Sequence, residues 1–120
     1  LDELLLISPH DQVSSDVRVL RAALQDSHHL VQDVSDARAV FRLEGPDGRE
    51  VLSKLCPVDL RPEAFGPGRF RRTRIAQVPC AFWMESETRI ELIAFRSVAD
   101  YVWGVLSHAN NPNARLSAGR

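Results

Sequence analysis

Apolar residues in the first part of the chain recur at two different spacings. An aliphatic run over residues 3–8 has the length of a strand, whereas Val17, Leu20 and Leu24 recur three and four positions apart. Residues at the second spacing share one face of a helix, so this pattern predicts an amphipathic helix over residues 16–25. The aliphatic run predicts a strand ahead of that helix.

Two further strands are predicted before the middle of the chain. They cover residues 28–33 and 37–44, and in the second of them Ala39, Phe41 and Leu43 occupy alternate positions. Alternate residues of a strand point to the same face. The second strand therefore has one apolar face and one face that is largely polar.

Asp47 begins a second predicted helix. Glu50 follows three residues later, which is the spacing of a capping box, and Val51 and Leu52 begin the apolar stripe. Pro57 prevents the helix from continuing, because the residue before a proline is biased away from helical geometry.

Three strands and a last helix follow a loop rich in proline and glycine at residues 62–68. The strands are predicted over residues 72–77, 80–85 and 89–95, where a proline and polar turn residues separate them into an antiparallel meander. Apolar positions over residues 98–106 then match helical spacing.

The predicted order is β-α-β-β-α-β-β-β-α in one domain over residues 1–110, followed by a polar, mobile tail over residues 111–120. This order predicts an α+β domain with an antiparallel or mixed sheet and helices mainly on one face. Residues 80–84 are apolar at every position, so both faces of that strand require cover. We infer a second layer, supplied by absent N-terminal chain or by another subunit.

Composition excludes several classes of protein. The chain has 120 residues, of which 44% are hydrophobic and 26% charged, and it carries a net charge of −1. These values favour a globular domain over a disordered or membrane-spanning chain, and they argue against bulk nucleic-acid binding. Two cysteines are too few for a disulfide framework and predict reduced thiols in the cytoplasm. A start at Leu1, inside an apolar pattern, suggests a trimmed fragment.

A cluster of arginines is the first candidate for chemistry. Guanidinium groups pair with phosphates, but strand alternation places Arg69 and Arg71 on one face and Arg72 and Arg74 on the other. No single basic surface results. We interpret these arginines as solvated or subunit-interface residues, with nucleic-acid binding as the less favoured alternative.

The nucleophiles and metal-binding residue types lack a catalytic setting. Cys56 stands at a predicted helix C-terminus, where the dipole disfavours a thiolate, and Cys80 lies in an apolar strand. His28 and His29 are adjacent on a predicted strand and cannot grip one metal together. The sequence therefore predicts no catalytic, cofactor-binding or metal-binding residue in this chain.

The two tryptophans are candidates for contact with a partner. Trp103 lies off the apolar stripe of the last helix, and Trp83 faces opposite to Phe82. Both positions suit tryptophans packed beneath another subunit, although a lid over the domain's own core is an alternative. The predicted interface residues are Trp83, Trp103, Arg71, Arg72 and Arg74.

Five short motifs stand in order along the chain at residues 34–38, 45–47, 51–60, 65–68 and 99–103. They read VSDAR, GPD, VLSKLCPVDL, FGPG and ADYVW. Together they resemble the gamma subunit family of heterotetrameric sarcosine oxidase. The resemblance covers most of the chain from about residue 34.

The resemblance implies a version of the fold of the glycine cleavage T-protein and other folate-binding proteins. It implies a noncatalytic accessory subunit that packs against larger alpha and beta subunits, in a complex that uses FAD, FMN, NAD and tetrahydrofolate to demethylate sarcosine oxidatively to glycine. The isolated chain could instead form a homo-oligomer. A rival interpretation is a free-standing tetrahydrofolate-binding protein of the aminomethyltransferase-like superfamily.

Overall fold

The computed structural model describes residues 3–114, and contacts within the chain divide it into two compact units. These are Leu1–Ser35 and Asp36–Arg120, where the sequence predicts one domain over residues 1–110. A 3-10 turn, Pro112–Ala114, falls in the predicted tail, and residues 115–120 of that tail lie outside the described residues.

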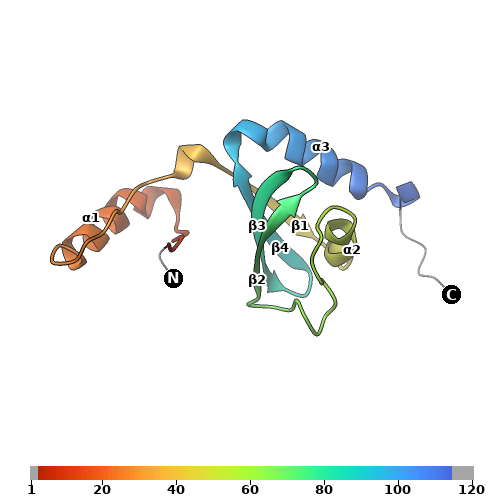
Figure 1. The fold of residues 1–120 in the computed structure, drawn as a ribbon, viewed down its shortest axis with the longest axis horizontal. Coiled ribbons are helices and arrows are strands. Elements are labelled where there is room, and N and C mark those ends of the chain that lie inside the picture. The colour runs from red at the N-terminus through yellow and green to blue at the C-terminus, as the bar shows by residue number, and fades with distance from the viewer. Residues whose placement is uncertain (1–2, 115–120) are drawn as a thin grey trace. The chain divides into compact units, whose positions relative to one another are not determined.

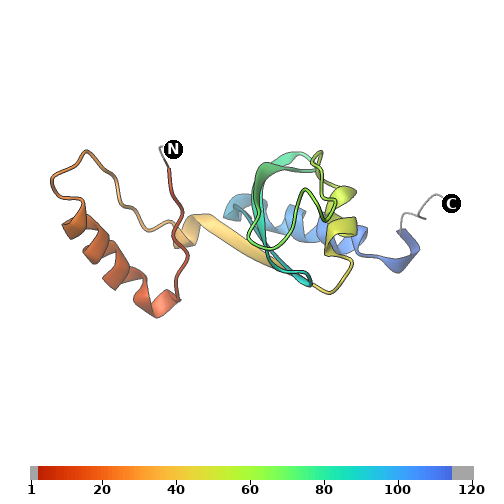
Figure 2. The same ribbon diagram turned by 90° about the horizontal axis from the view of Figure 1, so that it is seen from below.

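The first unit consists of one helix and the segments on either side of it. A short 3-10 turn, His10–Gln12, leads into α1, Val13–Ala23, and the chain then turns back (Figure 2). Arg21 donates a hydrogen bond from Nη2 to the carbonyl oxygen of Val31 at 2.9 Å. No described residue of this unit is buried, so α1 exists without a core of its own.

The two strands predicted in the first unit are wrong. Residues 3–8 and 28–33 have no regular secondary structure and pair with no strand of the described chain. A strand needs a neighbour to satisfy its backbone N–H and C=O groups. Aliphatic character alone signals a tendency toward burial and does not supply that neighbour.

The second unit is built on a four-stranded antiparallel sheet (Figure 1). The strands are β1 (Arg38–Glu44), β2 (Phe70–Ile75), β3 (Val78–Ser86) and β4 (Arg89–Phe95). Their order across the sheet is β1-β4-β3-β2, so the predicted meander of β2, β3 and β4 is extended by β1. The α+β class is confirmed.

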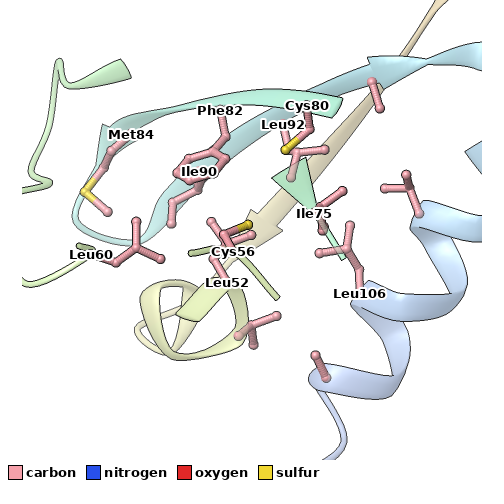
Figure 3. Packing of buried hydrophobic residues seen from close by; sticks show 14 of the residues in the cluster. Leu52, Cys56, Leu60, Ile75, Cys80, Phe82, Met84, Ile90, Leu92 and Leu106 are labelled. Atoms are coloured by element: carbon pink, nitrogen blue, oxygen red, sulfur yellow. The ribbon is translucent and has the colours of Figure 1, made fainter. Parts of the chain in front are cut away.

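Two helices cover one face of this sheet, which we call the inner face. α2 (Gly48–Ser53) and α3 (Ala99–Ala109) bring Leu52, Val102 and Leu106 against alternate strand residues (Figure 3). The strand residues of this core are Ile75, Cys80, Phe82, Met84, Ile90, Leu92 and Ala94. The prediction that the helices lie mainly on one face is correct for the second unit.

Candidate functional site

The two cysteines lie together in the core and have no catalytic setting. Cys56 follows α2 and Cys80 belongs to β3, and both are buried free thiols of the same core (Figure 3). The neighbouring Cys80 thiol and burial raise the pKa of the Cys56 thiol. Because the thiolate is the reactive form, Cys56 is poorly suited to attack a substrate. Its placement as a small packing residue is as the sequence predicts.

Potential metal ligands are dispersed. Within residues 3–114, no three histidine, cysteine or acidic side chains come together in a way that could hold a metal ion. His29 donates from Nδ1 to the carbonyl oxygen of Ser27 at 2.8 Å, in a segment without regular structure. The candidate functional residues of the described chain are therefore sought on its surfaces.

The face of the sheet opposite α2 and α3, which we call the outer face, combines apolar and basic side chains. Strand alternation and the strand register assign these residues to it. They are Arg38, Val40, Arg42, Glu44, Phe70, Arg72, Arg74, Pro79, Ala81, Trp83, Arg89, Glu91, Ile93 and Phe95. An antiparallel sheet with one solvated face normally presents polar residues there. This face instead leaves Val40, Phe70 and Phe95 between 45% and 58% exposed.

The predicted interface arginines divide between the two faces. Arg72 and Arg74 are exposed on the outer face, and within residues 3–114 neither side chain makes a hydrogen bond or ion pair. Arg71 points to the inner side, where it donates a hydrogen bond to the carbonyl oxygen of Ala64 and lies 5.6 Å from the ring centroid of Phe65. The alternation predicted for this strand is confirmed, and Arg71 binds its own chain.

An ion pair between a half-exposed arginine and a buried glutamate lies on the outer face and was not found from the sequence. Arg42 donates from Nε to Glu91 Oε1 at 2.6 Å, and Glu91 is only 5% exposed. This hydrogen bond raises the pKa of Arg42. The two residues are direct partners in the register of β1 and β4. Their opposite charges could predict this ion pair only if the pairing of β1 with β4 were already known.

Arg38 is a second residue that the sequence did not indicate. Its guanidinium carbon lies 4.3 Å from the ring centroid of Phe95, which is cation–π geometry. Its Nε atom is buried and has no hydrogen-bond partner in the described chain. Buried polar groups normally have a hydrogen-bond partner, so a buried nitrogen without an acceptor is unusual.

The two tryptophans belong to different surfaces. Trp83 is partly buried on the outer face, where it is the register partner of Phe70. Trp103 is 66% exposed on α3 and lines a groove of about 350 Å³. Residues 41–48, including Gly45 with φ of 117°, form much of the rest of that groove, together with Val51 of α2 and further residues at the end of α3. The five predicted interface residues therefore do not form one patch, although Trp83, Arg72 and Arg74 share a face.

Comparison with known proteins places the chain beside one group. Residues 1–112 match the model of the "Sarcosine oxidase, gamma subunit family". Relatives named sarcosine oxidase subunit gamma are 34% identical over 100 residues in Corynebacterium sp. (strain U-96) and 41% identical over 86 residues in an Arthrobacter species. These alignments cover 83% and 72% of this chain, but only 48% and 41% of the relatives.

A solved structure has the same fold. A chain of the heterotetrameric sarcosine oxidase from Corynebacterium sp. U-96, in complex with pyrrole 2-carboxylate, superposes with a TM-score of 0.79 at 30% identity. The match covers 88% of this chain and 54% of that one. The present chain thus spans about half the length of the proteins it matches.

Proposed function

We propose, because this chain belongs to the sarcosine oxidase gamma subunit family, that it is a noncatalytic accessory subunit of a sarcosine oxidase complex. It acts by packing against larger alpha and beta subunits and stabilising them, while they oxidatively demethylate sarcosine to glycine. The observation that carries the proposal is the match over residues 1–112 to this family. The surfaces described above, with exposed aromatic side chains and unpaired arginines, support a role in association.

A cytoplasmic location is part of the same proposal. Cys56 and Cys80 are both free thiols, which is the form that a reducing compartment maintains. Within the described residues, no helix is long and apolar enough to cross a membrane.

Co-expression tests the function directly. The alpha and beta subunits are produced with and without this chain, and soluble yield, assembled mass and sarcosine turnover are compared. We expect lower soluble yield and less assembled complex when the chain is omitted. Equal assembly and equal turnover in its absence would contradict the proposal.

Calorimetry separates the proposal from the folate-binding alternative. Purified chain is titrated with tetrahydrofolate, and an accessory subunit that holds no folate should give no binding heat. Saturable heat with roughly one-to-one stoichiometry would favour a folate-binding protein. The groove beside Trp103 would then be the first place to look for the ligand.

A further inference from the structure

We propose that the outer face of the sheet is the surface on which a larger subunit docks. The docking surface of that subunit is apolar at its centre and carries carboxylates opposite Arg38, Arg72 and Arg74. This inference rests on the proposed function and adds to it the location and the chemistry of the contact.

The centre of the outer face is apolar across neighbouring strands. The register aligns Val40 of β1 with Ile93 of β4, and Ile93 with Ala81 of β3. Ile93 is only 8% exposed because its neighbours flank it, while Val40 remains 58% exposed. Beside this row, Trp83 is aligned with Phe70, which is 53% exposed. Such a continuous apolar strip on one face is typical of a protein–protein contact.

Unpaired positive charges stand at both edges of this strip. Arg72 and Arg74 belong to the edge strand β2, and Arg38 belongs to the other edge strand, β1. The acidic residues assigned to the face, Glu91 and Glu44, are already paired with Arg42 and Arg89. An apolar centre with a charged rim is the usual anatomy of an interface. Carboxylates are the groups that would complement this rim, because they pair bidentately with guanidinium.

The guanidinium of Arg38, stacked on Phe95, supports the same occupant. Stacking on Phe95 fixes the plane of this guanidinium at 4.3 Å from the ring centroid, so the side chain is held in place before binding. Its Nε has no acceptor among residues 3–114. A carboxylate brought in by a partner would reach the guanidinium of a side chain that needs little further ordering.

A second copy of this chain fits the face less well. Two copies related by a twofold axis would bring two sets of unpaired arginines together, and like charges across an interface oppose association. Four strands of 7, 6, 9 and 7 residues at about 4.8 Å spacing present roughly 450 Å². Two such faces would bury about 900 Å², which is below the range of stable interfaces. A larger subunit can extend the contact beyond the sheet.

The test compares matched variants of the full chain for binding to co-purified alpha and beta subunits. In one pair of variants, Phe70→Ser and Arg72→Glu with Arg74→Glu alter the outer face. In the control, Trp103→Ser alters an aromatic residue of similar exposure on α3. We expect each outer-face variant to weaken binding about tenfold or more, and Trp103→Ser to change it less than about threefold. Raising the salt concentration should weaken binding of the wild type more than that of the arginine variant.

Separate controls test whether the variants fold and whether the proposed function holds. Circular dichroism should give all variants the wild-type thermal midpoint, since the altered side chains are exposed. If the wild-type chain fails to bind the larger subunits, the proposed function itself is wrong. If the wild type binds and the outer-face variants bind equally well, only the docking surface is wrong.

Two further measurements test whether a second copy of this chain, or the chain itself, covers the outer face. Light scattering of the isolated chain would overturn the proposal if it showed a dimer that Phe70→Ser dissociates. Acrylamide quenching of a Trp103→Phe variant reports on Trp83 alone, and for its partly buried side chain we expect quenching between that of a buried and that of a fully exposed tryptophan. A Trp83 shielded in the monomeric chain would mean that the chain itself already covers this surface.

Discussion

α1 and α3 each contain 11 residues, yet only one of them belongs to a core. α3 buries Val102, Leu106 and Ala109 against the sheet, whereas α1 buries no residue. Both helices carry apolar residues at helical spacing, so the sequence pattern does not separate them. The difference lies in what each helix has beside it within its own unit, because burial of apolar area provides the main stabilisation.

We expect the greatest loss of stability from a leucine-to-alanine substitution in the core, and we compare it with the same substitution in the first unit. Leu92 is fully buried and Leu30 is 86% exposed. Leu92→Ala should lower the free energy of unfolding by about 2–5 kcal/mol, while Leu30→Ala should change it by less than about 0.5 kcal/mol. Chemical denaturation followed by circular dichroism measures both. Similar losses in the two variants would mean that the first unit has a core after all.

An intermediate effect is expected within β2. Arg71 holds the carbonyl oxygen of Ala64 and lies over Phe65, whereas its neighbour Arg72 makes no such contact. Arg71→Ala should cost about 1–2 kcal/mol of unfolding free energy, since a partly buried carbonyl loses a charged donor. Arg72→Ala serves as the matched control and should be close to neutral in the isolated chain. Equal values in thermal and urea denaturation would contradict this assignment of the two arginines.

A smaller effect should follow from removing the first unit. Because residues 3–35 bury no side chain, deletion of residues 1–35 should change the unfolding free energy of the second unit by less than about 1 kcal/mol. The shortened chain should still unfold in one cooperative step in calorimetry. Loss of that cooperative transition would contradict this prediction, because the folding of the second unit would then depend on the first.

The smallest effect concerns exposed carboxylates, one in each unit. Hydrogen bonds from the side chain and backbone of Arg61 lower the pKa of Asp59 to about 2. Hydrogen bonds from Ser35 lower the pKa of Asp33. A carboxylate with a lowered pKa in the folded state stabilises the protein above its unfolded value, near pH 4, and this contribution is lost as pH falls toward 2.

NMR titration of the carboxyl carbons measures these two groups. Arg61→Gln should raise the pKa of Asp59 toward its ordinary range and leave Asp33 unchanged, whereas Ser35→Ala should do the reverse. If the titration midpoint of Asp59 stayed near pH 2 in this variant, a group other than the Arg61 guanidinium would be responsible for the lowered pKa.

The sequence was sufficient for the helices and strands of the second unit and for α1, but the two strands predicted in the first unit are wrong. The strand around Ala39 is predicted by its regular alternation, and those around Phe82 and Leu92 by apolar runs of strand length that turn residues separate. The run at residues 3–8 was equally apolar but is not a strand in the structure. Apolar character reports the benefit of burial, whereas a strand also needs a hydrogen-bonding neighbour that local sequence does not identify.

The same limit applies to the candidate site. Alternation correctly separated Arg71 from Arg72, since side-chain direction in a strand is a local property. The pairing of Arg42 with Glu91 and the stacking of Arg38 on Phe95 could not be predicted in this way. Both depend on the register of β1 against β4, two strands that are far apart in the chain.

The strand order β1-β4-β3-β2 also sets a sequence of events during synthesis. β2, β3 and β4 join through short hairpins, whereas residues 38–44 must wait for residues 89–95 before their ladder can form. Non-local pairing of this kind slows folding, and an unpaired apolar strand is prone to aggregate while it waits. β1 carries Arg38 and Arg42 along this segment, and such charges discourage the waiting strand from adding to another nascent chain.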